Sequence, residues 1–259
     1  EKAFTFVNLG EGGAGLSGGS RASAWATLRA ALVDARTYPA RFITSNEGDA
    51  LNRVDAQAFS AAARGSQLML VAASRASDIR QLIALKEENT NLNIAIVGAQ
   101  EAWMVADDLA EAEIPVIIDP FANLPSSFQS LGSTQHNAER LIEAGVTTAF
   151  AHMGDDSHQT RLILQTAGNA VANGVEHSAA LRAITSAPAE IFGVPNYGSL
   201  RTGSAGDLVV WDGDPLEVMS APTQIFIDGI EQSLESRQTK LRDRYISLDE
   251  SERPLAYKR

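Results

Sequence analysis

The sequence predicts an α/β fold of the (β/α) TIM-type barrel class, followed by a small β module. Short, continuously apolar segments such as Leu68–Ala73 and Ile94–Val97 alternate with amphipathic helical segments. This alternation is typical of parallel strands joined by crossover helices. No Walker pattern follows a strand, and a nucleotide-binding doubly wound sheet is the less favoured alternative. From Tyr197 onward, short apolar runs bounded by Gly, Asp and Pro indicate the separate β module.

The expected elements follow in chain order from the spacing of apolar residues and from capping and breaking residues. Phe4–Val7 reads as a strand, which the glycine-rich stretch Gly10–Gly19 ends. Ser20 is the expected N-cap of a helix that Pro39 ends, and residues 40–52 are expected to run over the surface. Further helices are expected at residues 55–64, 77–88, 101–112, 137–144, 159–173 and 178–192. Further strands are expected at residues 68–73, 94–97, 115–118, 147–151, 207–211 and 224–230.

The changes in pattern divide the chain into three ranges. We expect the barrel portion at residues 1–196, a β-sandwich module at 197–232, and a C-terminal helix and tail at 233–259. Because the chain enters its first strand without a preceding segment, an unpaired strand edge is expected there. Exposed edges promote association, so a homo-oligomer or a missing N-terminal segment is expected.

Composition and charge exclude several classes of function. The chain has 259 residues, with 32 acidic and 21 basic side chains and a net charge of −11. Nucleic acids and anionic membranes require a basic surface, so we expect neither as a partner. No apolar run is long enough to span a membrane. The absence of cysteine excludes disulfides, thiolate metal ligands and cysteine nucleophiles.

Three neighbouring segments carry a family resemblance. Residues 183–194 read AITSAPAEIFGV, residues 198–200 read GSL, and residues 203–211 read GSAGDLVVW. This series resembles the amidohydrolase superfamily, and within it the imidazolonepropionase-like and adenine-deaminase-like branch. The resemblance covers roughly residues 65–245, and Gly206 stands where the family usually has Ala.

The resemblance implies a metal-dependent barrel with a composite β-sandwich built from both chain ends. It implies hydrolysis of a non-peptide C–N bond by water that one or two divalent metals activate. Members of this branch are often exported in Gram-negative bacteria, so a periplasmic location is also implied. The family's first ligands form a His-x-His pair, which this sequence lacks, and its first histidine is His136.

The other ligand positions of the family can be placed on this sequence. The resemblance puts histidines at Ala72 and Gly98, and an aspartate at His152 or Met153. Alanine and glycine offer no donor atoms, and a catalytic zinc needs about three protein ligands. We therefore expect a degenerate metal site without a bound transition metal, and no other cofactor.

The densest chemical cluster lies after the predicted strand at residues 147–151. It contains His152, Asp155, Asp156 and His158. Because the active sites of such barrels lie at the carboxyl ends of the strands, His152, Asp155 and Asp156 are the candidate catalytic residues. The alternative interpretation is a polar loop that caps the next helix.

Polar and aromatic residues also follow the two preceding strands. Arg75 comes after the strand at 68–73, and Gln100, Glu101 and Trp103 come after the strand at 94–97. Their place at the same edge makes them candidates for substrate binding. The alternative for Trp103 is burial in the packing of the helices, and Asp119 is a lone carboxylate expected to pair with a neighbouring loop.

Two functions remain open from the sequence. The first is a hydrolase of C–N bonds with an atypical site that acts on a small-molecule substrate. The second is a catalytically inactive barrel that binds a small molecule or supports a partner enzyme.

Overall fold

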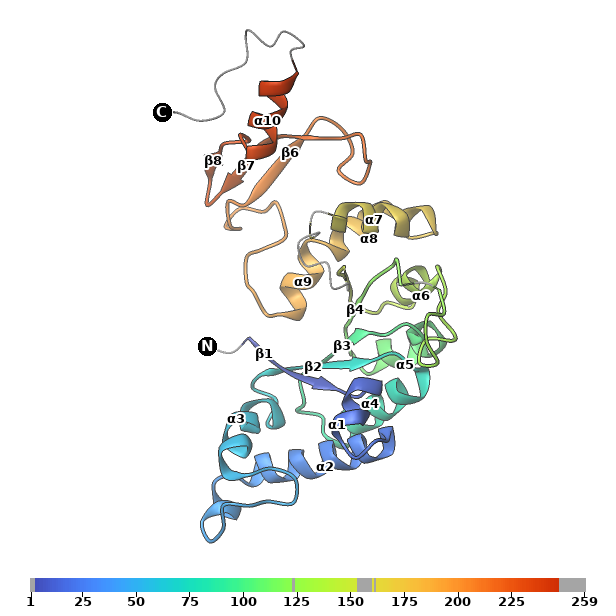
Figure 1. Cartoon of the computed structure of the whole chain (residues 1–259), viewed down its shortest axis with the longest axis vertical. Coiled ribbons are helices and arrows are strands. Elements are labelled where there is room, and N and C mark those ends of the chain that lie inside the picture. The colour runs from blue at the N-terminus through green and yellow to red at the C-terminus, as the bar shows by residue number, and fades with distance from the viewer. Residues whose placement is uncertain (1–2, 123, 153–159, 161, 247–259) are drawn as a thin grey trace. The chain divides into compact units, whose positions relative to one another are not determined.

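A parallel sheet of five strands forms the centre of the computed structural model, in the order β1-β2-β3-β4-β5. The strands are β1 (Phe4–Asn8), β2 (Leu68–Ala73), β3 (Ile94–Gly98), β4 (Val116–Ile118) and β5 (Thr148–Phe150). Every neighbouring pair is parallel, including β2 with β3. The prediction of parallel strands joined by crossover helices is therefore confirmed (Figure 1).

The structure describes residues 3–122, 124–152, 160 and 162–246. The chain divides into a larger unit, Glu1–Thr202, and a smaller unit, Gly203–Arg259. None of the helices in the described ranges is long and apolar enough to cross a membrane.

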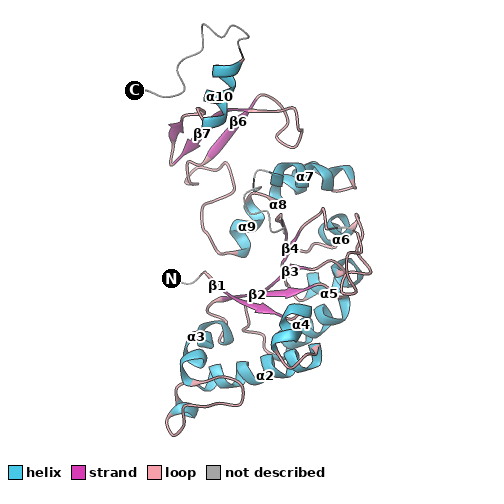
Figure 2. Cartoon of the chain, viewed as in Figure 1, coloured by secondary structure: helices cyan, strands magenta, loops and turns pink. Residues whose placement is uncertain are grey.

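Helices of the larger unit connect and cover the strands (Figure 2). They are α1 (Glu11–Leu16), α2 (Arg21–Thr37), α3 (Arg53–Ala63), α4 (Ala76–Glu88), α5 (Ala106–Glu111), α6 (Asn137–Glu143), α7 (Ile163–Ala172), α8 (His177–Ala183) and α9 (Ser186–Ile191). Two short 3-10 helices, η1 (Ala40–Phe42) and η2 (Ala102–Val105), lie between them. The predicted cap of α2 is confirmed, because the Ser20 side chain accepts a hydrogen bond from the backbone N–H of Ser23 at 3.0 Å.

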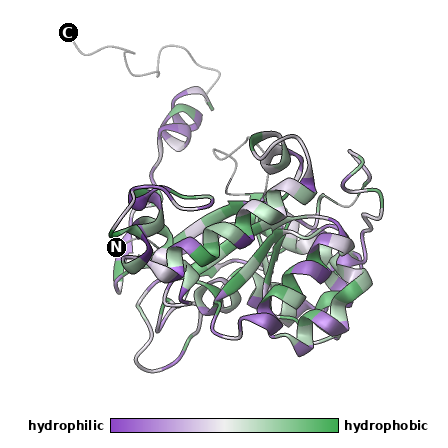
Figure 3. Ribbon diagram, turned by 90° about the horizontal axis from the view of Figure 1, so that it is seen from below, coloured by the Kyte–Doolittle hydropathy of each residue, from purple (hydrophilic) through white to green (hydrophobic). Residues whose placement is uncertain are grey.

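The strands β2 to β5 bury both of their faces, which explains their continuously apolar sequences. One face contributes Leu68, Leu70 and Ile117 to a cluster that Ala187 and Ile191 of α9 cover. The opposite face carries fully buried side chains such as those of Met69, Val71, Ile96 and Val116. Figure 3 shows the resulting band of hydrophobic strands between helices that are mixed in character.

β1 lies at the edge of the sheet and pairs with β2 in the described part of the chain. The side chains of Phe4 and Phe6 stand 40% and 55% exposed. In register they accompany Leu68 and Leu70, so they continue the apolar cluster toward the edge. The expected exposed edge is therefore present, whereas an oligomer or a further segment remains a prediction.

The sequence predicts that residues 40–52 run over the surface. In the structure this segment also has a buried contact. It encloses the side chain of Asp34, which is fully buried. The backbone N–H groups of Ala50 and Leu51 donate to Asp34 Oδ2 at 2.8 and 3.0 Å, and Arg41 Nε lies 3.0 Å from Oδ1. Burial raises the pKa of Asp34, but these N–H donors and Arg41 outweigh it and hold the pKa below its ordinary value. The carboxylate thus anchors the whole segment to α2.

Two predicted helices are each divided in the structure. The glycine-rich stretch at residues 10–19 contains α1, in which Gly13 packs so closely on the backbone carbonyl of Asn8 that only glycine fits. The helix expected at 101–112 divides into η2 and α5, because the backbone of Val105, with φ of −138° and ψ of 28°, leaves the helical region between them. The helix expected at 178–192 divides into α8 and α9, because Pro188 has no N–H to continue it.

The smaller unit contains an antiparallel sheet in the order β6-β7-β8. Its strands are β6 (Leu208–Trp211), β7 (Pro222–Ile227) and β8 (Ile230–Gln232). The single strand expected at 224–230 is a hairpin, because Asp228 and Gly229 have φ of 52° and 76° and form a two-residue turn. The helix α10 (Arg237–Tyr245) follows and begins with a capping box between Ser236 and Thr239.

Candidate active site

A histidine and an aspartate meet at the carboxyl ends of β5 and β4. The backbone N–H of Ala151 donates to the carbonyl of Ile118 at 2.9 Å, which extends the pairing of these strands beyond β5. This places His152 beside Asp119, with 3.6 Å between His152 Nδ1 and Asp119 Oδ2. A histidine next to a carboxylate is the arrangement that general acid–base catalysis uses.

Burial and hydrogen bonding hold the Asp119 carboxylate in place. Its side chain is 8% exposed, and Oδ1 accepts the backbone N–H of Phe121 at 2.9 Å. The side chain of His152 is 23% exposed, and its Nδ1 atom is buried. The distance of 3.6 Å exceeds a hydrogen bond, and such pairs often tighten only when substrate binds.

The structure describes only part of the predicted catalytic cluster. His152 lies at the strand end, where the sequence placed it, whereas Asp155 and Asp156 lie outside the described residues. Sequence reasoning missed that Asp119 is the partner of His152, because it expected Asp119 to pair with a neighbouring loop. Its position directly after an apolar strand was the available signal, since parallel strands deliver their carboxyl ends to one edge.

Glu101 and Arg75, two of the four predicted substrate-binding residues, hold the loop between β4 and α6. Glu101 accepts the backbone N–H of Ala76 at 3.1 Å and that of Gly132 at 3.0 Å. Arg75 donates through Nη2 to the backbone carbonyl of Phe128. Both side chains therefore tie this loop across the ends of β2 and β3.

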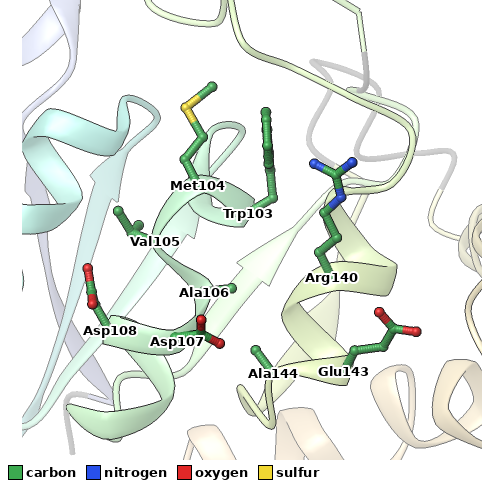
Figure 4. Close-up of a pocket in the computed structure, with 9 residues that line it drawn as sticks. All are labelled: Trp103, Met104, Val105, Ala106, Asp107, Asp108, Arg140, Glu143 and Ala144. Atoms are coloured by element: carbon green, nitrogen blue, oxygen red, sulfur yellow. The ribbon is translucent and has the colours of Figure 1, made fainter.

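Gln100 and Trp103 follow β3 in different environments. Gln100 is partly buried in the turn that leaves the strand. Trp103 lines a cavity between η2, α5 and α6, next to Arg140, and neither His152 nor Asp119 lines this cavity (Figure 4). The structure therefore does not bring Trp103 together with His152 and Asp119 in one site.

The described residues at the sheet edge offer few ligands for the metal centre that the family resemblance implies, and the degenerate site stays a prediction. Ala72 and Gly98 lie at the ends of β2 and β3 without any donor atom in their side chains. In the described ranges, no three His, Asp or Glu side chains come together in a way that would hold an ion. His152 and Asp119 alone are fewer than the roughly three ligands of a catalytic zinc.

The fold and the comparison with known proteins identify the class of this chain. The profile of the amidohydrolase family matches residues 62–238. The chain belongs to the amidohydrolase family.

Individual proteins are similar to parts of this chain. Amidohydrolase tasK of Hapsidospora irregularis is 33% identical over 100 residues, which are 38% of this chain and 10% of that protein. The crystal structure of an amidohydrolase from Thermotoga maritima MSB8 has a TM-score of 0.75 and 24% identity, over 89% of this chain and 62% of that chain. An uncharacterized protein of known structure has a TM-score of 0.50 and 18% identity, over 70% of this chain and 48% of that chain. The chain thus spans less than two thirds of the length of each of these proteins.

Proposed function

We propose that this protein hydrolyses a non-peptide C–N bond of a small molecule, with His152 and Asp119 as its acid–base pair. Membership of the amidohydrolase family and similarity to hydrolases support the reaction class. The observation that carries the proposal is the approach of His152 Nδ1 to Asp119 Oδ2 at the carboxyl ends of β5 and β4. Asp155 and Asp156 follow in the chain and remain candidates for the same site.

The chemistry assigned to the pair uses the two nitrogens of one imidazole. Asp119 orients the ring through Nδ1, which leaves Nε2 to accept a proton from water. The water oxygen then attacks the carbon of the C–N bond, and the same Nε2–H returns the proton to the departing nitrogen. The net reaction adds one water and releases an amine or ammonia.

The proposal includes an architecture. The five parallel strands would belong to a (β/α) TIM-type barrel, supported by their consecutive order and by the TM-score of 0.75 to the Thermotoga maritima amidohydrolase. The three-stranded sheet at residues 208–232 would belong to a composite β-sandwich. The edge of β1 would pair with a further strand, from a second copy or another segment, and a periplasmic location follows from the family resemblance alone.

A second function is favoured by the lack of ligand atoms at Ala72 and Gly98. Because these positions offer no ligand atoms, a barrel that binds a small molecule without turnover, or that supports a partner enzyme, is the alternative. Metal analysis of the purified protein after dialysis bears on both functions. Stoichiometric zinc would contradict our expectation that no transition metal is bound.

The two functions are separated by an assay that detects, by mass spectrometry, a product that has gained one water or the amine or ammonia that an acyclic substrate releases. The purified chain is offered cyclic imides, cyclic ureas and N-acyl amino acids, with and without added zinc. We expect His152→Gln to remove about 99% of any turnover or more, since a positioned acid–base group contributes 10²–10⁴-fold. His136→Gln is the matched control, because His136 is an exposed residue that pairs with Glu139 on α6. Full activity of His152→Gln would overturn the assigned pair, and binding without turnover of any compound would favour the alternative.

A further inference from the structure

A cavity between η2, α5 and α6 combines a stacked arginine with several carboxylates (Figure 4). It is a hollow of about 410 Å³ that is open to the surface, and most of the side chains that line it are exposed. Ala106 and Ala144 contribute only methyl groups between the two helices, so a hollow remains there. The cavity lies apart from the His152–Asp119 pair, and nothing in the proposed reaction uses it.

Two side chains at one end of the cavity are held in a defined position. The indole N–H of Trp103 donates to the carbonyl of Gly132 at 2.8 Å, and its backbone N–H donates to Asn137 Oδ1 at 3.0 Å. The guanidinium carbon of Arg140 lies 4.4 Å from the centroid of the Trp103 ring. A guanidinium that packs its face on a ring leaves the N–H donors at its edge available. These donors match the two oxygens of a carboxylate.

Carboxylates line the other parts of the same cavity. Asp107 comes from α5 and Glu143 from α6, and both side chains are exposed. Asp108 lines the margin beside Val105 (Figure 4). Arg140 forms no salt bridge with these or with any other carboxylate in the described part of the chain. Arg140 and Glu143 lie three residues apart on α6, so their charges are separated by about one helical turn.

We propose that this cavity binds a small zwitterion of the α-amino-acid type. Its carboxylate would lie on Arg140, its ammonium group near Asp107 and Glu143, and its side chain against Trp103. A simple anion is disfavoured because it would meet the carboxylates, and a simple cation because it would meet Arg140. This site is independent of the proposed hydrolase function, because it shares none of the residues assigned to that reaction.

The test is a titration followed by the indole N–H resonance of Trp103 in two-dimensional ¹H–¹⁵N NMR spectra. The chain has three tryptophans, so Trp103→Phe identifies the signal. The probes are L-alanine, propionate and ethylamine, of which the last two each lack one of the charged groups of alanine. We expect L-alanine to shift the resonance in a saturable way, and the other two to bind at least about tenfold more weakly. Equal binding of propionate or of ethylamine, or no saturable shift with L-alanine, would overturn the proposal.

Matched variants locate the two charged contacts. Arg140→Gln and Asp107→Asn should each weaken L-alanine binding by about tenfold, the loss that corresponds to about 1.4 kcal/mol. Arg80→Gln changes an exposed arginine on the neighbouring helix α4 and should leave the affinity unchanged. Circular dichroism and thermal unfolding check that each variant is folded. Unchanged affinity in a folded Arg140→Gln variant would contradict the assignment, even if a hydrolase activity were found elsewhere.

Discussion

The parallel sheet of the larger unit and the antiparallel sheet of the smaller unit bury similar sequences to very different degrees. In β2, with the sequence LMLVAA, all side chains except that of Ala72 are buried. In β6, with the sequence LVVW, Val209 and Val210 remain 43% and 39% exposed. Helices cover both faces of the first sheet, whereas α10 of the smaller unit has no buried residue. An apolar run therefore predicts a strand, but the elements packed against the strand decide how much its burial stabilises the fold.

The largest effect expected from this difference concerns Asp34 in the larger unit. Asp34→Ala should lower the free energy of unfolding by about 3–5 kcal/mol, because it removes a fully buried carboxylate and leaves Arg41 and two backbone N–H groups without their partner. Asp49→Ala is the control, since Asp49 also pairs with Arg41, at 2.6 Å, but its side chain is 69% exposed. The control should lose less than about 1 kcal/mol in chemical denaturation. Equal losses would show that burial of Asp34 is not the cause.

The same carboxylate predicts a dependence of stability on pH. Its folded pKa lies below the ordinary value, so its contribution is fully present above the pKa of an unfolded aspartate, about 3.9. The contribution is lost as the pH falls from there through the folded pKa. The difference in unfolding free energy between the native protein and Asp34→Asn should therefore shrink below about pH 4. A difference that stays constant down to acid pH would argue against a lowered pKa.

A pair of isoleucine substitutions compares the two sheets directly. Ile96 is fully buried in β3, and Ile230 is 67% exposed in β8. Ile96→Ala should cost about 2–5 kcal/mol because it leaves a cavity between sheet and helices. Ile230→Ala should change the unfolding free energy by no more than about 0.5 kcal/mol. A loss of several kcal/mol at Ile230 would mean that the smaller sheet has a cover that is absent from the described residues.

The smallest expected effects come from the helix caps of the two units. Asn52 accepts the backbone N–H groups of Val54 and Asp55 at the start of α3, and Asn52→Ala should cost about 1 kcal/mol. Ser236→Ala removes the capping box of α10, which lacks buried residues. We expect it to reduce local helix content, measured by backbone chemical shifts, without changing the stability of the larger unit. A cooperative loss throughout the larger unit would contradict this separation.

Part of the candidate site was predictable because it depends on position along the chain. His152 follows an apolar strand, and the carboxyl ends of parallel strands form one edge, so its place in the site could be predicted. The position of Glu101 at this edge was also predicted, but its role in holding a loop was not. Its two oxygens accept N–H groups from Ala76 and Gly132, of which the second is 31 residues away in sequence. Periodicity and spacing carry no information about such a pairing.

The sequence by itself determined where most strands and helices of the larger unit lie, that the strands of the larger sheet run parallel, and that Ser20 caps α2. These features depend on the spacing of apolar residues and on local hydrogen bonds, which neighbours in sequence supply. Only the tertiary structure decided that Asp119 stands beside His152, that Asp34 is enclosed by the segment after α2, and that Arg140 stacks on Trp103. Each of these contacts joins elements whose distance in space depends on how strands and helices pack, and packing is set by the whole unit at once.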